Sequence, residues 1–375
     1  MGKLKKLRLL VLLFGAICFL ILLTYSYTIP KNGNVNLNLE PIINTTPDPK
    51  FPWSVNSSRN LRDYIVPENE TAVINNVNIC NTNVSNEKPL IVIVVCSAVA
   101  NDNLRQAIRD TWMQKDHSVP FDIRTVFLLG RVMNDVMQRE TLIESNKHGD
   151  IIQEGFIDSY LNLTLKSVMM LKWVKHYCQQ ATFVLKTDDD MFVNIRQLSD
   201  YLSRVLDRKD LIAGSLFRRH TPVRNSRSKW YVPEFMYDSK YYPNYVSGGG
   251  YVISGPLVPV LFDKALQVPY FHFEDVYLTG IVAKAANVIP EDNTSFGFRT
   301  LPVDPCVYRH LITSHGLSPN ELRSIWQSVN DPSLMCPSAH LPLAICFFIS
   351  FLLGACLIFK CCRLRREKLA ISQIK

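Results

Sequence analysis

Residues 182–190 read Thr-Phe-Val-Leu-Lys-Thr-Asp-Asp-Asp and join a short apolar run to three consecutive acids. The apolar run is typical of a buried β-strand, so the acids are expected at the edge of a sheet. Asp188 and Asp190 are two positions apart and would point to the same side of an extended backbone. Their oxygens suit Mn²⁺ or Mg²⁺, ions that commonly also hold substrate phosphates. The stretch predicts a metal that binds a diphosphate, and a solvated acidic turn is the alternative interpretation.

The sequence on both sides of this stretch alternates between predicted strands and helices. The predicted strands are 90–95, 125–129, 150–153 and 183–185, and the predicted helices are 103–113, 132–146 and 163–177. Such alternation predicts an α/β domain with a mostly parallel sheet, here residues 87–337. Ligands of such sheets bind at the carboxyl ends of the strands, where Asp188 is predicted to lie.

Each end of the chain combines an apolar segment with a basic one. Residues 9–29 are uncharged, long enough to span a bilayer, and preceded by the basic residues 1–8. Residues 341–359 are a second apolar segment, followed by the basic residues 360–375. Because basic flanks stay in the cytosol, we expect a signal anchor, a second transmembrane helix and two cytosolic tails. The alternatives are a cleaved signal peptide at the first segment and a buried helix of the domain at the second.

The region between the two apolar segments has the features of a lumenal or extracellular chain. The two ends hold a formal charge of +9 against a total of +8, which leaves −1 for the rest of the chain. The net positive charge of the chain therefore reflects the expected membrane topology, and it predicts no nucleic-acid partner. Sequons for N-glycosylation lie at Asn44, Asn56, Asn69, Asn83, Asn162 and Asn293.

Residues 30–86 are rich in Asn, Pro, Thr and Ser and lack sustained periodicity. They predict a flexible, glycosylated stem, with order beginning near Lys88. The enclosed region holds five cysteines, an odd number, so at least one thiol is free or pairs elsewhere. Cys96, inside an apolar run, is the one expected to be free and buried. The other four are Cys80, Cys178, Cys306 and Cys336.

Two arginines follow the first predicted strand. Arg105 and Arg109 are four positions apart and share one face of a predicted helix. Two guanidinium groups at a strand-to-helix junction could clamp a diphosphate. An exposed helix face is the alternative interpretation.

Three glycines, Gly248, Gly249 and Gly250, precede an apolar run. Glycines permit a close approach of the backbone to a ligand, and the tyrosines around them, such as Tyr245 and Tyr251, suit sugar rings. A phosphate-binding loop is a rival interpretation, but the Lys-Ser/Thr pair of a P-loop is absent. A plain turn with ordinary aromatic packing is a further alternative.

Glu274 and Asp275 are adjacent acids between apolar residues. Paired acids are costly to bury without a task, so one of them could act as general base toward a substrate hydroxyl. The alternative is a helix N-cap that faces solvent. His310 and His315 keep a histidine contribution to the metal site open.

Together these segments resemble the β-1,3-galactosyltransferase family, glycosyltransferase family 31. The resemblance extends from about Lys88 to Cys336 and rests on eight motifs in the family's order. They are residues 105–112 (Arg-Gln-Ala-Ile-Arg-Asp-Thr-Trp), 127–130 (Phe-Leu-Leu-Gly), 158–166, 186–192, 228–231, 242–254, 274–277 and 312–321. The resemblance implies a GT-A fold, which is a Rossmann-like mixed α/β sheet flanked by helices. It also implies a Golgi membrane anchor and Mn²⁺-dependent transfer from a UDP-sugar.

The resemblance implies a role for each candidate residue. The arginines Arg105 and Arg109 resemble the family's nucleotide-binding pair, and Asp188 looks like the acid on the nucleoside side. Asp190 and His315 resemble the metal ligands, and Asp275 resembles the catalytic base. The remaining candidates are assigned to substrate binding: Lys186, Gly248, Gly249, Gly250 and Glu274.

The expected reaction is an inverting transfer of galactose from UDP-galactose to the 3-hydroxyl of an acceptor glycan on a glycoprotein or glycolipid. N-acetylglucosamine transfer by the same fold and an inactive glycan-binding relative are the alternatives. The intact acidic motif and the Glu-Asp pair favour activity, and the spelling Glu-Asp-Val-Tyr resembles galactosyltransferases. Two departures matter. The segment 341–359 is extra in a family of usually single-pass members, and some members have Gly-x-Gly in place of Gly-Gly-Gly.

Overall fold

The computed structural model of the 375-residue chain describes residues 58–81 and 88–336. Both predicted transmembrane segments, the two basic tails and most of the predicted stem lie outside these residues. Within the described part of the chain, no helix is long and apolar enough to cross a membrane. Residues 58–81 and 88–334 belong to one compact unit, Asp48–Leu334.

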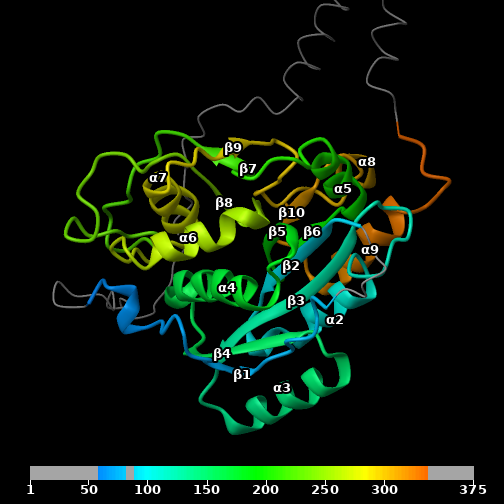
Figure 1. Cartoon of the computed structure of the whole chain (residues 1–375). Coiled ribbons are helices and arrows are strands. Elements are labelled where there is room, and N and C mark those ends of the chain that lie inside the picture. The colour runs from blue at the N-terminus through cyan, green and yellow to red at the C-terminus, as the bar shows by residue number, and fades with distance from the viewer. Residues whose placement is uncertain (1–57, 82–87, 337–375) are drawn as a thin grey trace, which may run out of the picture. The chain divides into compact units, whose positions relative to one another are not determined.

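The described residues form an eight-stranded mixed sheet in the order β1-β4-β3-β2-β5-β8-β7-β9 (Figure 1). Strands β4, β3, β2 and β5 run parallel, whereas β8 is antiparallel to both of its neighbours. The α/β class and the mixed sheet are confirmed: four of the seven strand pairs are parallel and three are antiparallel. The strands are β1 (Ala72–Ile74), β2 (Leu90–Cys96), β3 (Asp122–Arg131), β4 (Ile151–Ile157), β5 (Ala181–Asp188), β7 (Ile212–Phe217), β8 (Tyr245–Ser254) and β9 (Glu291–Asp292).

A second, two-stranded sheet pairs β6 (Met191–Val193) with β10 (Thr313–His315). The α-helices are α2 (Asp102–Asp110), α3 (Asp135–His148), α4 (Leu163–Tyr177), α5 (Ile195–Ser203), α6 (Val258–Ala265), α7 (Ala283–Ala285), α8 (Pro305–Tyr308) and α9 (Pro319–Val329). Short 3₁₀ turns are η1 (Leu61–Asp63), η2 (Val99–Asn101), η3 (Tyr160–Asn162) and η4 (Gly255–Leu257), and η5 (Val276–Val282) is a π-helix.

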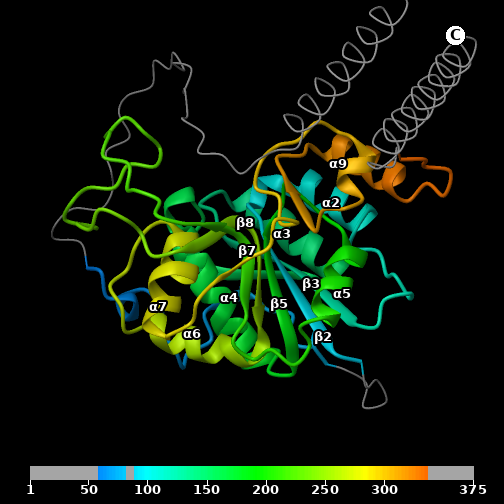
Figure 2. The ribbon, with the colours of Figure 1, turned by 90° about the horizontal axis from the view of Figure 1, so that it is seen from above.

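The alternation of side chains along β2 divides the core into two layers. Val92 and Val94 belong to the apolar cluster that includes α4 and α6. Ile91 and Ile93, on the opposite face, belong to the cluster that includes α2, α5 and α9. Figure 2 shows these two groups of helices on opposite sides of the sheet. A strand covered on both faces must be apolar throughout, which is why β2 reads as a continuous apolar run.

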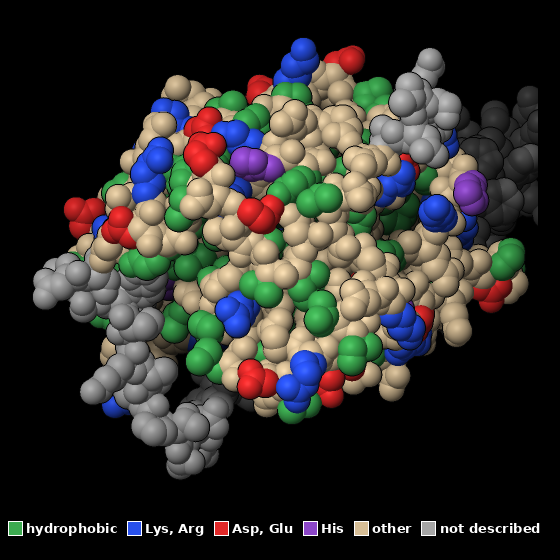
Figure 3. All heavy atoms as spheres, turned by 60° about the horizontal axis from the view of Figure 1, so that its bottom comes forward, with side chains coloured by type: hydrophobic (Ala, Val, Ile, Leu, Met, Phe, Trp, Pro, Cys, Tyr) green, Lys and Arg blue, Asp and Glu red, His purple; other side chains and the backbone are tan. Residues whose placement is uncertain are grey.

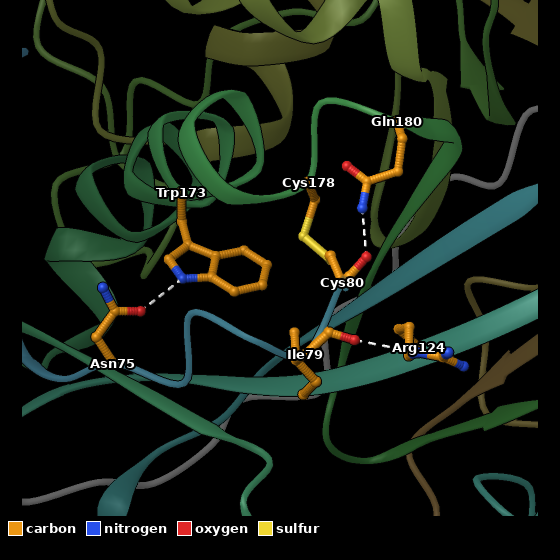
Figure 4. The surroundings of a disulfide bond; sticks show 7 residues. All are labelled: Asn75, Ile79, Cys80, Arg124, Trp173, Cys178 and Gln180. Carbon is orange, nitrogen blue, oxygen red and sulfur yellow. Dashed lines mark hydrogen bonds between the residues drawn. A yellow bond between two sulfur atoms is a disulfide. The ribbon is translucent and has the colours of Figure 1, made fainter. Parts of the chain in front are cut away.

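The segment before β2 is part of the folded domain, in contrast to the prediction that order begins near Lys88. Leu61 and Ile65 are fully buried, and β1 pairs with β4. A disulfide bond joins Cys80 to Cys178 at the end of α4 (Figure 4). Apolar residues in this segment are too sparse to show a period, so tertiary contacts alone reveal its place in the fold.

Side-chain hydrogen bonds reinforce that disulfide (Figure 4). Trp173 Nε1 donates to Asn75 Oδ1 at 2.9 Å, and Arg124 Nε donates to the carbonyl oxygen of Ile79 at 3.0 Å. Cys96 is free and buried, as predicted. On the face drawn in Figure 3, acidic and basic side chains are interspersed, which agrees with the near-neutral charge of the chain between its two ends.

Candidate active site

The acidic motif lies at the carboxyl end of the central strand β5, as predicted. Asp188 is the last residue of β5 and lies beside Cys96 at the end of β2. Asp189 and Asp190 form the turn that leads to β6. The backbone is therefore not extended through the motif, and the prediction that Asp188 and Asp190 share one side of a strand does not hold.

The three acids of the motif have different partners. Asp188 Oδ1 accepts from Lys186 Nζ at 2.7 Å. Asp189 is buried, and its Oδ2 accepts from the side chains of Ser97 at 2.7 Å and Asn101 at 2.9 Å. Asp190 Oδ2 lies 3.3 Å from His315 Nε2. Asp189 thus holds the turn against the end of β2, while its two neighbours, each 34 % exposed, face outward.

Asp190 and His315 meet because β10 pairs with β6 directly after the acidic turn. The backbone carbonyl of Asp190 also accepts from the amide of Leu317 at 3.0 Å, which fixes the turn to the segment after β10. Burial raises the pKa of Asp190, and His315 opposes that shift. The structure brings these two predicted metal ligands together, and their role as ligands stays a prediction.

The donor set of this pair fits a divalent ion that also binds substrate. A carboxylate oxygen suits Mn²⁺, and an imidazole nitrogen is a common metal ligand. Within residues 58–81 and 88–336, no cluster of three or more His, Cys, Asp and Glu side chains could hold a metal ion. Two partly exposed protein ligands would leave the other coordination positions to water and phosphate oxygens, as is usual for ions in phosphate-binding sites.

Asp275 directly precedes the π-helix η5 as its N-cap and is partly buried. Its Oδ1 accepts from its neighbour's amide, that of Val276, at 2.8 Å, and its Oδ2 accepts from the amide of Gly248 in β8 at 3.3 Å. Burial and the adjacent Glu274 carboxylate raise the pKa of Asp275 to about 7. A general base works best when its pKa lies near the pH of the reaction, so this environment suits the predicted role.

Glu274 and Lys186 are internal residues, in contrast to their assignment to substrate binding. Lys186 is 2 % and Glu274 6 % exposed, and Lys186 Nζ donates to Glu274 Oε1 at 3.0 Å. Burial by itself would lower the pKa of Lys186, but the Asp188 and Glu274 carboxylates raise it well above its ordinary value. Lys186 is therefore a buried ammonium ion between two carboxylates.

The three glycines lie inside strand β8 rather than in a loop before it. A Cβ atom on Gly248 would lie 2.7 Å from Glu274 Oε1, and one on Gly250 would lie 3.1 Å from the Thr313 methyl group. Gly249 has more room, because its nearest neighbour would be the Met191 sulfur at 3.4 Å. The glycines thus admit neighbouring side chains of the protein, and their predicted close approach to a ligand stays a prediction.

Arg105 and Arg109 are bound by carboxylates of the fold. Arg105 is 1 % exposed and forms a bidentate pair with Glu144 through Nε and Nη2. Its other contacts are to Ser97 Oγ and the carbonyls of residues 98 and 99. Arg109 pairs with Glu144 and Asp150. The structure favours a role in holding the loop after β2, and neither residue forms the predicted open clamp; their assignment to the nucleotide remains a prediction.

Three tyrosines lie close enough to Asp275 for its charge to act on them. The pKa values of Tyr242 and Tyr245 are raised, first by burial and then by the Asp275 charge. Burial and the charges of Asp275 and Asp188 also raise the pKa of Tyr160, although 52 % of its surface is exposed. Tyr160 was not among the predicted site residues, although it lies in the motif 158–166 that carries part of the resemblance. It begins the 3₁₀ turn η3, directly before α4.

A pocket of about 670 Å³ lies apart from this site. Its lining includes Lys88, Asp122 and Arg124, from the amino ends of β2 and β3, together with His117 and His148. None of the acidic-motif residues and neither Glu274 nor Asp275 contributes to it. The carboxyl-end location of Asp188 and Asp275, rather than the volume of a cavity, marks the candidate active site.

Residues 103–294, more than half of the chain, match the family model described as Galactosyltransferase. The chain belongs to the galactosyltransferase family. It is 35 % identical to Beta-1,3-galactosyltransferase 1 of Homo sapiens over 268 residues, which are 71 % of this chain and 80 % of that protein. The Mus musculus protein of the same name gives the same values.

A second relative of this galactosyltransferase-family chain is Beta-1,3-galactosyltransferase 2 of Homo sapiens. It is 37 % identical over 246 residues, which are 64 % of this chain and 58 % of that protein. Among solved structures, the apo form of the bifunctional glycosyltransferase WbbM covers 67 % of this chain and 51 % of its own chain. At 12 % identity and a TM-score of 0.36, that likeness is too small to carry a conclusion.

Proposed function

We propose that this galactosyltransferase-family protein transfers galactose from UDP-galactose to the 3-hydroxyl of an acceptor glycan, with formation of a β-1,3 linkage. The supporting observation is the adjacency of two groups at the carboxyl end of β5. The first group is Asp190 with His315. The second is Glu274 with Asp275, and Lys186 connects it to the acidic motif through its bonds to Glu274 and Asp188. The printed names of the relatives support the sugar and the linkage. The domain is then a glycosyltransferase of the GT-A type.

Asp275 is the proposed general base. Its carboxylate takes the proton of the acceptor hydroxyl while that oxygen forms a bond to the anomeric carbon of galactose. The bond between the anomeric carbon and the diphosphate oxygen breaks, and its electron pair leaves with UDP. A single displacement inverts the configuration, so an α-linked donor gives a β-linked product. One base is sufficient, and a retaining route would need a second, nucleophilic carboxylate.

Asp190 and His315 are the proposed protein ligands of Mn²⁺. When bound there, the ion would supply charge neutralisation for the departing diphosphate. Asp188 lies one residue from the turn and faces outward, so it is the proposed contact on the nucleoside side. Asp189 keeps both outward-facing acids in place through Ser97 and Asn101.

The tyrosines near Asp275 are the proposed acceptor side of the site. Tyr160 and Trp230 are partly exposed, at 52 % and 39 % of their surfaces. Partly exposed aromatic side chains combine an apolar face with a polar tip, a combination that suits sugar rings. The loop that carries Trp230 is compact, because the Arg224 guanidinium donates to the carbonyls of Val232 at 2.7 Å and Tyr237 at 2.6 Å.

The proposed location is the Golgi membrane, with the catalytic domain in the lumen and its acceptor on a glycoprotein or glycolipid. The apolar segments 9–29 and 341–359, their basic flanks and the sequons support this proposal. The disulfide between Cys80 and Cys178 is compatible with an oxidising compartment.

The experiment that tests the proposed function compares two donors. Purified full-length protein is incubated with Mn²⁺ and with either UDP-galactose or UDP-N-acetylglucosamine over a panel of acceptor oligosaccharides. We expect transfer from UDP-galactose, with a product that a β-1,3-specific galactosidase cleaves. Transfer from UDP-N-acetylglucosamine alone would show that the donor sugar is N-acetylglucosamine and would refute the proposed galactose transfer. Binding of glycans without turnover of either donor would favour the inactive relative, against which the intact Asp190 and Asp275 argue.

A further inference from the structure

The ammonium group of Lys186 connects the acidic motif to the segment that carries Asp275. Its Nζ donates to Asp188 Oδ1 at 2.7 Å, to the carbonyl of Gly248 at 2.5 Å and to Glu274 Oε1 at 3.0 Å. An ammonium group has three donors, so this arrangement uses all of them. With 2 % of its side chain exposed, Lys186 has neither a free donor nor an accessible surface for a substrate.

The Glu274 carboxylate is enclosed in the same way. Its Oε1 accepts from Lys186, and its Oε2 accepts from Ser167 Oγ at 3.0 Å and from the Tyr251 hydroxyl at 3.1 Å. These donors come from β5, α4 and β8, three elements that are far apart in the sequence. Glu274 is therefore a fixed point between the sheet and α4, and it directly precedes Asp275.

Strand β8 approaches this pair at Gly248, where no side chain could be accommodated. The Gly248 carbonyl binds Lys186, its amide donates to Asp275 Oδ2 at 3.3 Å, and the space of its missing Cβ is filled by Glu274 Oε1. One residue of β8 thus contacts the ammonium group, the buried carboxylate and the proposed base. A displacement of any one of these groups would move the others.

We infer that Lys186 and Glu274 are positioning residues whose ion pair fixes the first turn of η5 against β5 and β8 and so aims Asp275 at the acceptor hydroxyl. The inference rests on the proposed function, because it takes Asp275 as the base of that reaction. Burying two charges is costly even when they pair, so a buried pair is better explained by the geometry that it specifies than by added stability. Neither residue is expected to touch donor or acceptor.

The first test measures hydrogen exchange in the full-length protein. Lys186→Met removes the ammonium group, and Glu274→Gln removes the charge while keeping the side chain's shape. In each variant we expect the amides of η5 to exchange faster by about 10-fold or more, because a local contact that holds this turn is lost. Unchanged exchange in η5 in both variants would overturn the inference. Should Lys186→Met fail to fold, Glu274→Gln carries the same test.

The second test measures the kinetics of galactose transfer. We expect kcat to fall by about 10²-fold in each variant, the usual effect of a small misplacement of a catalytic group. KM for UDP-galactose should stay within about threefold in Glu274→Gln, because that change leaves the bond between Lys186 and Asp188 in place. The double variant should lose about as much as the worse single variant, since coupled residues are not additive. A raised KM with unchanged kcat, or losses that multiply in the double variant, would overturn the inference.

Lys175→Met is the matched control. It removes an ion pair of the same type, with Asp263 at 2.8 Å, but on the surface, where 32 % and 57 % of the two side chains are exposed. We expect wild-type kcat and wild-type exchange in η5. The exchange test does not depend on the sugar. A wild-type protein that transfers no galactose would refute the proposed function, and the exchange rates would still decide whether the pair holds η5.

Discussion

Gly248→Ala is the substitution whose effect can be worked out most directly from the structure. The added Cβ would lie 2.7 Å from Glu274 Oε1 and 3.3 Å from Asp275 Cβ, and real Cβ atoms essentially never show contacts below 3.0 Å. Glu274 has no simple way to retreat, because Lys186, Ser167 and Tyr251 hold it from three elements. The strand and the Glu274–Asp275 segment must therefore move apart.

The expected cost follows from this overlap. Overpacking of a filled interior costs about 1–3 kcal/mol. For a domain of this size each kcal/mol lowers Tm by about 2–4 °C, so we expect a decrease of about 2–12 °C. A shift of Asp275 by a fraction of an ångström to one ångström is expected to reduce kcat by up to about 10²-fold. Calorimetry and the kinetics of transfer from UDP-galactose measure the two effects.

Gly249→Ala is the matched comparison for stability. It places the same methyl group one residue further along β8, where the nearest atom is the Met191 sulfur at an ordinary 3.4 Å. The backbone of this residue is not left-handed, so the change should be neutral or stabilise by about 0.4–1 kcal/mol through the unfolded chain. Equal Tm values for the two alanine variants, with wild-type kcat for Gly248→Ala, would refute the reasoning.

Three further predictions concern the metal, the pH profile and the topology. Asp190→Ala should abolish transfer and Mn²⁺ binding in the presence of UDP while leaving Tm near that of wild type; calorimetric titration showing undiminished Mn²⁺ binding would contradict the ligand assignment. Because Asp275 acts as base only when ionised and its pKa is raised to about 7, kcat should fall as the pH drops below that value. A profile that is flat from about pH 5 to 8 would exclude a base of this pKa. A tag after Lys375 should be digested by protease in sealed Golgi vesicles while residues 31–339 are protected, and a protected tag would exclude the second transmembrane helix.

Much of the sheet was predictable because its strands are buried on both faces. Leu90–Cys96 is apolar at every position, and the residues of β5 lead directly into acids that water or a ligand must solvate. Such runs combine length, composition and boundaries in one local signal. The placement of Asp188 at the carboxyl end of a strand followed from that signal alone.

The roles of individual side chains were less predictable because they depend on contacts between distant segments. Lys186 was assigned to substrate binding, but in the structure its third N–H donor binds Glu274. Arg105 looks like a diphosphate clamp until Glu144, 39 residues later, is seen to pair with it. Ser167 carries no signal at all, since a serine in the middle of a helix has many possible partners. Local sequence thus identified the polar residues of this region, but it predicted neither their burial nor the partners that satisfy them.

The course of the backbone before β2 was also not predictable from local sequence. Residues 58–81 have the composition of a flexible segment, yet Leu61 is fully buried and Cys80 is bonded to Cys178. A disulfide that closes a long loop can hold a segment with few apolar residues in place. Sequence spacing alone did not reveal that partner.

The most direct test of the account is the rate of galactose transfer by Asp275→Asn. Asparagine keeps the size of the side chain, and its single amide oxygen can still accept from the amide of Val276 in the position of Oδ1. Its NH2 group cannot replace Oδ2 as the acceptor of the longer bond from Gly248, and the side chain cannot take up a proton. We predict that kcat with UDP-galactose falls by about 10²–10⁴-fold while binding of UDP and Tm are retained. Wild-type kcat in Asp275→Asn, together with loss of activity in Glu274→Gln, would contradict the account by moving the base to the neighbouring acid.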